Sequence, residues 1–172
     1  MIEKVILVDE DDNELGTMEK MEAHIKGELH RAFSVFIFNS NGELLLQQRA
    51  LDKYHSPGLW TNTCCSHPRL NEETHDAAQR RLVEEMGMHS SVKEAFSFIY
   101  KSKFDNDLTE HELDHVFIGQ DDTLPKINTE EVASYRYVSL ADLEQEIKHD
   151  PEAFTTWFRI CLARVIEHQK NA

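Results

Sequence analysis

Short runs rich in aliphatic, aromatic and β-branched residues recur along the chain, and polar turn signals separate them. Such runs predict strands, because these side chains pack well on the pleated surface of a sheet. Asn41-Gly42 is a strong signal for a tight hairpin between two of these strands. The predicted strands cover residues 4–9, 32–38, 43–49, 59–65, 92–100, 110–118 and 135–138.

Helices are predicted between and after these strands. One of them carries an apolar stripe and ends at Gly87, with Thr74 as its predicted N-cap. Ser139 and Asp142 resemble a capping box at the start of another helix. The predicted helices cover residues 18–25, 74–86, 139–148 and 152–169. Clustered strands with helices inserted among them predict an α+β fold, with mixed sheets flanked by helices rather than regular βαβ winding.

The composition fits a globular protein of one domain, since 172 residues are enough to bury a core. The chain has 18 Lys and Arg residues against 32 Asp and Glu residues, a net charge of -14. This charge argues against a nucleic-acid or anionic-membrane partner. It still allows a small anionic substrate, because metal ions and a few local cations can hold one.

Cysteine usage and hydropathy set the expected compartment. The three cysteines, two of them adjacent at Cys64 and Cys65, do not suggest a disulfide framework. The chain shows no signal-peptide pattern and no apolar run near the roughly 18 residues that a membrane span needs. We therefore expect a reduced, cytoplasmic protein that is a monomer or a weak dimer.

Two pairs of reactive residues share the same spacing. Cys65 and His67 are two residues apart, and so are Glu110 and Glu112. On a strand, residues two apart point to the same face, so each pair can direct both side chains to one place. A thiol, an imidazole and two carboxylates that converge would form a metal site with a reactive sulfur beside it.

The helix over residues 74–86 places Glu84 and Glu85 in its last turn, where the macrodipole disfavours negative charge. Arg80 and Arg81 stand four residues before them, in the weaker orientation for a helical ion pair. The helix end is either a solvated face with modest salt bridges or a place where a bound cation offsets the repulsion. Because Cys65 and His67 are close in the sequence, we favour the cation.

Residues 66–88 resemble the Nudix box, a loop and helix that bind magnesium and diphosphates. The matching positions are Glu72, Arg80, Glu84, Glu85 and Gly87. Two positions depart from the box: Ser66 replaces a glycine and Arg81 replaces a glutamate. The missing glutamate argues against ordinary Nudix hydrolysis, because those hydrolases concentrate carboxylates to hold several magnesium ions.

Longer segments are similar to the type I isopentenyl-diphosphate isomerases. The stretch from Trp60 to Pro68, with its two cysteines, resembles their active-site signature, and so does the stretch from Glu110 to Asp114. Further matches are residues 16–20, 24, 30–34, 49–51 and 53. The resemblance implies a single Nudix-like isomerase domain over residues 1–172. It also implies conversion of isopentenyl diphosphate to dimethylallyl diphosphate with Mg²⁺ and one divalent transition metal, Mn²⁺ or Zn²⁺.

The resemblance also assigns roles to single residues. Cys65 and Glu112 become the acid and base of the proton transfers, and Tyr100 supports Glu112 through its hydroxyl. The transition-metal ligands become His24, His30, His67, Glu110 and Glu112, and Glu85 becomes the magnesium ligand. The groups that hold the diphosphate become Lys20, Arg49, Lys53 and Arg81, and Trp157 covers the hydrocarbon end of the substrate.

Each of these residues also has an ordinary structural reading. Tyr100 and Trp157 can be packing residues, and the four cations can be solvated surface groups. The remaining histidines are read as surface or core residues: His55, His75, His89, His111, His115, His149 and His168. Two alternative functions stay open, a Nudix hydrolase of a nucleoside diphosphate and a metal- or diphosphate-binding module without chemistry.

Overall fold

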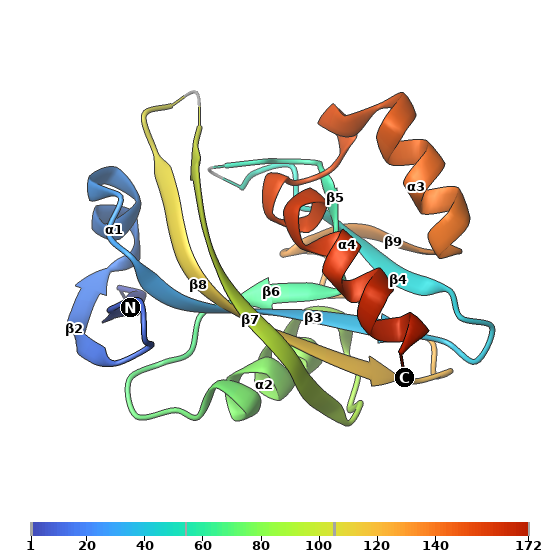
Figure 1. Ribbon diagram of the computed structural model, residues 1–172, viewed down its shortest axis with the longest axis horizontal. Helices are drawn as coiled ribbons and strands as arrows, with labels where there is room; N and C mark the ends of the chain where they lie inside the picture. Colours follow the sequence, from blue (N-terminus) through green and yellow to red (C-terminus); the bar gives the residue numbers. More distant parts are fainter. Residues whose placement is uncertain (1, 54, 105, 172) are drawn as a thin grey trace.

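A single mixed sheet with helices on both faces forms the body of the protein (Figure 1). The computed structural model describes residues 2–53, 55–104 and 106–171. Strand β3 (His30–Phe38) is central to the sheet. It pairs antiparallel with β4 (Leu44–Arg49) and β6 (Cys64–Ser66), and parallel with β8 (Thr109–Gln120). This parallel pair makes the sheet mixed, and the predicted α+β class is confirmed.

The other elements extend or cover this centre. The remaining strands are β1 (Lys4–Val8), β2 (Glu14–Glu19), β5 (Trp60–Thr61), β7 (Val92–Lys103) and β9 (Val132–Val138). The helices are α1 (Lys20–Lys26), α2 (Thr74–Met86), α3 (Leu140–His149), the 3₁₀ turn η1 (Pro151–Ala153) and α4 (Thr156–Lys170). No helix in the described ranges is both long and apolar enough to cross a membrane.

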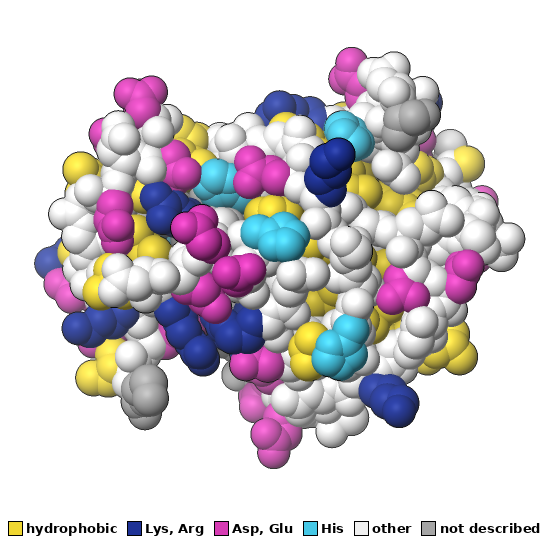
Figure 2. Space-filling model, turned by 90° about the horizontal axis from the view of Figure 1, so that it is seen from below, with side chains coloured by type: hydrophobic (Ala, Val, Ile, Leu, Met, Phe, Trp, Pro, Cys, Tyr) yellow, Lys and Arg dark blue, Asp and Glu magenta, His cyan; other side chains and the backbone are white. Residues whose placement is uncertain are grey.

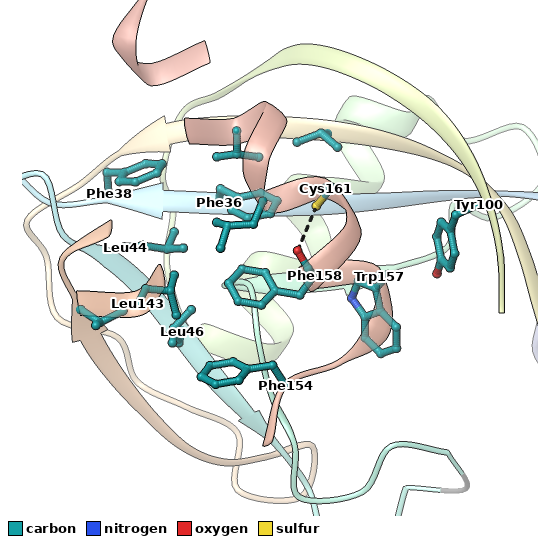
Figure 3. Packing of buried hydrophobic residues seen from close by; sticks show 14 residues of the cluster. Phe36, Phe38, Leu44, Leu46, Tyr100, Leu143, Phe154, Trp157, Phe158 and Cys161 are labelled. Carbon is teal, nitrogen blue, oxygen red and sulfur yellow. Dashed lines mark hydrogen bonds between the residues drawn. The ribbon is translucent and has the colours of Figure 1, made fainter. Parts of the chain in front are cut away.

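Alternation along β3 divides the core into two layers. Phe33, Val35 and Ile37 join a buried cluster with the apolar stripe of α2. Phe36 and Phe38, on the opposite face, join a second cluster with α4 (Figure 3). Both faces of β3 are therefore apolar and buried, as expected for a strand that helices cover on both sides.

The strand predicted over residues 59–65 is interrupted, and β5 and β6 lie on either side of the break. The Asn62 side-chain amide donates to the carbonyl oxygens of Val35 and Cys64, at 3.2 and 2.7 Å. The Thr63 hydroxyl donates to the carbonyl oxygen of Leu45 at 2.6 Å. These buried side chains replace ladder hydrogen bonds at the break, so the backbone can turn without leaving polar groups unsatisfied.

Two other predictions about the elements were wrong in detail, and one strand was not predicted. The helix predicted over residues 152–169 is broken at Phe154 and Thr155, where Thr155 N–H donates to the Trp60 carbonyl at 3.0 Å. Thr74 is not an N-cap, because the extended residue before α2 is Glu73. Strand β2 was missed, since its residues are mostly exposed and show no apolar alternation. The predicted Ser139 cap is confirmed, because its hydroxyl accepts from Asp142 N–H at 3.1 Å.

Candidate active site

A cavity of about 520 Å³ opens where β3, β4, β6, β8 and α2 converge. Most of the predicted site residues line it: Lys20, Arg49, Lys53, Cys65, His67, Arg81, Glu85, Glu110, Glu112 and Trp157. His24, His30 and Tyr100 are not among the lining residues, but they contact the two carboxylates, as described below. The structure therefore brings together predicted site residues that are up to 137 positions apart, while the chemical roles of these residues remain predictions.

Strand β3 determines how the two halves of the site meet. Its Ser34 pairs with Cys65 of β6, and its His30 pairs with Glu112 of β8. The cysteine and the carboxylates therefore come from the two strands on either side of β3. The expectation that both pairs converge is confirmed, although His67 lies just beyond the end of β6 rather than within a strand.

The two cysteines point in opposite directions, as their adjacent positions predict. Cys64 is fully buried among the α2 residues, and its thiol donates to Glu85 Oε2 at 3.1 Å. Cys65 is partly buried and lines the cavity on the side of the α4 cluster. Burial raises the pKa of the Cys65 thiol above its usual value, so this group keeps its proton at neutral pH.

Tyr100 connects the two carboxylates of β8. Its hydroxyl lies within hydrogen-bond distance of Glu110 and of Glu112, 2.7 Å from Glu112 Oε1. All three side chains are buried. Burial and then the charge of Glu112 raise the pKa of Glu110, which is the expected effect of two crowded, buried carboxylates. Tyr100 thus contacts the acid pair directly and is more than a packing residue.

Imidazoles surround the other oxygens of these carboxylates. His30 Nε2 and His67 Nε2 lie 3.1 and 2.8 Å from Glu112 Oε2, and His24 Nε2 lies 3.5 Å from Glu110 Oε2. The other ring nitrogens of His24 and His30 face the carbonyl oxygens of residues 20 and 28, at 2.7 and 2.9 Å. When Nδ1 donates to such a carbonyl, the Nε2 lone pair is available to a metal.

The donor set fits a divalent metal ion. Ligand atoms about 2.1 Å from an ion lie about 3.0 Å from their neighbours in an octahedral shell. The distances of 2.8 to 3.5 Å between the imidazole nitrogens and the carboxylate oxygens match that spacing. Two groups of three could hold an ion, His24 with His30 and Glu112, and His24 with His55 and Glu110.

The carboxylate of Glu85 already has protein partners at the end of α2. Arg81 lies 3.2 Å from Glu85 and 2.8 Å from Glu84, and the Gln47 amide donates to Glu85 at 3.3 Å. Arg81 therefore compensates the charge at this helix end, so the dipole alone does not distinguish a bound cation from an ordinary salt bridge. Glu85 still faces the cavity, and a single carboxylate suits a magnesium ion that is shared with a substrate phosphate.

The predicted diphosphate-binding cations differ in how firmly the protein holds them. Lys20 pairs with Glu3 at 3.3 Å, and Arg81 also pairs with Glu131 at 2.7 Å. Arg49 is 9% exposed, and its Nε has no hydrogen-bond partner among the residues that the structure describes. Its guanidinium lies 5.2 Å from the centre of the Trp157 ring. A buried guanidinium nitrogen that lacks an acceptor suits an anionic ligand.

Other residues that were assigned to neither the substrate nor a metal also line the cavity, among them His55, Arg69 and Arg80. Arg80 is held by Glu72 at 2.8 Å and by Glu84 at 3.1 Å. His55 Nε2 lies 3.4 Å from Glu110 Oε2, although the residue was read as an ordinary surface or core histidine. On the face seen in Figure 2, basic and acidic side chains lie interleaved with histidines close by, a mixed pattern instead of a uniform acidic surface.

Known proteins share much of this sequence. The model of the NUDIX domain family matches residues 28–158. An isopentenyl-diphosphate delta-isomerase from Pectobacterium atrosepticum is 54% identical over 165 residues, with 96% of this chain and 92% of that protein covered. An isopentenyl-diphosphate delta-isomerase 2 from Aromatoleum aromaticum is 53% identical over 166 residues, with 96% and 88% covered.

Solved structures show the same fold at lower sequence similarity. A crystal structure of a Deinococcus radiodurans protein matches with a TM-score of 0.76 at 20% identity, over 96% of this chain and 98% of that one. A MutT protein from Methanosarcina mazei matches with a TM-score of 0.66 at 19% identity, over 83% and 96%. Because the family model covers most of the chain and the relatives share about half of its residues, the chain belongs to the Nudix family and, within it, to the isopentenyl-diphosphate delta-isomerases.

Proposed function

We propose that this chain converts isopentenyl diphosphate to dimethylallyl diphosphate, with Cys65 and Glu112 as the two proton-transfer groups. The observation that carries the proposal is that Cys65 and Glu112 reach one cavity from strands on opposite sides of β3. A hydrolase would use carboxylates around a diphosphate and would leave Cys65 without a task. The relatives that share half of the sequence bear the name of this isomerase.

The reaction moves a double bond by one position and leaves the diphosphate intact. One of the two groups adds a proton to the terminal alkene carbon, so that a tertiary cation forms at the neighbouring branched carbon. The other group removes a proton from the carbon on the far side of that cation, which restores a double bond. A positioned acid or base typically contributes roughly 10²–10⁴ to such a rate.

Tyr100 assists through its contact with Glu112, and Trp157 assists from the wall of the cavity. The Tyr100 hydroxyl orients Glu112 and can donate its proton to either carboxylate of the pair. Trp157 is 3% exposed, comes from α4 and lies at the same end of the α4 cluster as Tyr100 (Figure 3). Its indole presents apolar surface for the hydrocarbon chain, and an aromatic face can stabilise a carbocation by cation–π attraction.

The cations around the cavity hold the diphosphate in this proposal. Lys20, Arg49, Lys53 and Arg81 all line it, in a protein of net charge -14. The replacement of a Nudix glutamate by Arg81 favours binding over cleavage, because the helix gains a cation and loses a metal ligand. Glu85 would hold Mg²⁺ together with the substrate, and the bound ion would neutralise part of the diphosphate charge.

His24, His30, His67, Glu110 and Glu112 would hold the second ion, Mn²⁺ or Zn²⁺. Imidazole and carboxylate donors suit both metals. When bound, this ion offsets the buried negative charge of the two carboxylates and fixes their orientation.

Three free cysteines suit a reducing compartment, so we also place the protein in the cytoplasm. The proposal further includes a monomer or weak dimer without nucleic-acid or membrane partners.

The test is incubation of the purified protein with isopentenyl diphosphate and Mg²⁺, with all products quantified by NMR and free phosphate measured in parallel. We expect dimethylallyl diphosphate to account for the substrate consumed, without phosphate release. Phosphate release would support the hydrolase, and no turnover would support a binding module. The same incubation with a nucleoside diphosphate provides the matched control, and we expect no reaction with it.

A further inference from the structure

His55 is placed beside the carboxylates by ring packing. It is 8% exposed and comes from the loop between β4 and β5. Its ring stacks almost parallel on Phe104, with centroids 5.0 Å apart and 7° between the planes. The edge-to-face contact with Trp157 has a centroid distance of 5.8 Å. These two aromatic rings hold the plane of the imidazole.

The fixed ring directs Nε2 at Glu110. Nε2 of His55 lies 3.4 Å from Glu110 Oε2, almost the same distance as Nε2 of His24 at 3.5 Å. The His24 ring lies between two neighbours, with centroids 5.7 Å from His55 and 5.2 Å from His30. The two possible metal-binding groups share His24, so His55 lies next to the donors of the predicted metal site.

We infer that His55 is a sixth protein ligand of the transition metal that the two carboxylates would share. This inference rests on the proposed metal site and adds a residue to it. Four imidazoles and two carboxylates would then be available, which is the number of donors in an octahedral shell. The spacing of 3.4 Å between His55 and Glu110 lies in the range shown by the other donor pairs of the site.

A complete shell has a chemical consequence. An ion with six protein ligands has no open position for water or substrate, as in structural rather than catalytic metal sites. Its role would then be to hold Glu110 and Glu112 in place, and proton transfer would remain with side chains. With only five protein ligands, one position would be open and would bind an exchanging water.

Water-proton relaxation of the Mn²⁺-loaded protein distinguishes a complete shell from an open one, because a coordinated exchanging water raises the relaxivity. We expect low relaxivity in the unaltered protein and an increase equal to one coordinated water in His55→Ala. We also expect a chelator to remove Mn²⁺ at least about tenfold faster from His55→Ala, since even outer-shell partners of metal ligands typically contribute about 10- to 100-fold in affinity. The matched control is His89→Ala, which removes an exposed histidine outside the cavity and should change neither quantity.

His55→Phe separates lost coordination from lost packing. It keeps an aromatic ring against Phe104 and removes both nitrogens, so it should fold normally and still lose Mn²⁺ faster. If His55 only donated a hydrogen bond to Glu110, His55→Ala would weaken retention without gaining a coordinated water. That result would overturn the inference, and so would unchanged retention in both variants or an unaltered protein that retains no Mn²⁺. None of these measurements requires turnover, so they can fail while the proposed isomerase activity stands.

Discussion

Replacing Tyr100 by phenylalanine isolates the hydroxyl that connects the two carboxylates. Tyr100→Phe keeps the ring, and with it the stacking on Phe98 at a centroid distance of 5.7 Å. It removes the donor that lies between Glu110 and Glu112. Both carboxylates are almost fully buried, so the loss of this donor removes a hydrogen bond that bulk solvent replaces poorly.

The expected loss of stability is that of one hydrogen bond. One O–H carries one proton, so it serves the two carboxylates as a single shared donor. A hydrogen bond to a charged group contributes about 1.5–3 kcal/mol. For a chain of this length, 1 kcal/mol shifts the unfolding midpoint by about 2–4 °C, so Tyr100→Phe should lower the midpoint by about 3–12 °C. If the same energy positions Glu112 for proton transfer, the rate should fall by about 10- to 150-fold.

Thermal unfolding of the chelator-treated protein measures the shift of the unfolding midpoint, and NMR of product formation measures the fall in the reaction rate. Tyr137→Phe is the matched control, because the Tyr137 hydroxyl is buried and has no hydrogen-bond partner among the described residues. This control should unfold and react like the unaltered protein. An unfolding midpoint for Tyr100→Phe equal to that of the control would refute the reasoning, and Tyr100 would then be a packing residue.

Three further changes test other parts of the structure. Cys65→Ser should reduce isomerisation roughly 10²–10⁴-fold with normal circular dichroism and metal content, while Cys64→Ser, which keeps a donor for Glu85, should do much less; equal rates for the two would contradict the assignment. Glu85→Gln should weaken Mg²⁺-dependent diphosphate binding in calorimetric titrations without removing the histidine-bound metal, and an unchanged Mg²⁺ dependence would mean that Glu85 only supports α2. Gly87→Ala should lower the unfolding free energy by more than about 1 kcal/mol, because φ is 62° and the new Cβ would lie 2.6 Å from the Lys126 carbonyl oxygen. The control Gly42→Ala, at φ 76° with no atom near the new Cβ, should lower the unfolding free energy by less. Equal losses in the two variants would exclude the Lys126 contact as the cause.

Local geometry explains why a few pairs of site residues could be predicted from spacing alone, while the other site residues were assigned only through the family resemblance. Cys65 and His67, like Glu110 and Glu112, are two residues apart, and the alternation of a strand is independent of the rest of the fold. The same holds for the pair of Arg81 and Glu85, which the spacing of a helix predicts and which the structure contains at 3.2 Å. In each case, the sequence separation is shorter than one element of secondary structure.

The features that the sequence did not predict depend on distant partners. The interruption between β5 and β6 requires Asn62 and Thr63 to reach the carbonyl oxygens of Val35 and Leu45, which belong to two other strands. Arg81 finds a further partner, Glu131, fifty residues away. The position of His55 depends on aromatic rings that come from β7–β8 and α4. No local sequence pattern identifies these contact partners, because the packing of the whole chain brings them together.

The most direct test of the central claim is the fate of solvent protons during turnover. The protein, isopentenyl diphosphate and Mg²⁺ are incubated in D₂O, and the position of deuterium in the product is followed by NMR. Protonation of the terminal alkene carbon predicts dimethylallyl diphosphate with deuterium in a methyl group, no released phosphate, and loss of this incorporation in Cys65→Ser. Product without solvent deuterium, or free phosphate in place of the allylic product, would contradict the account.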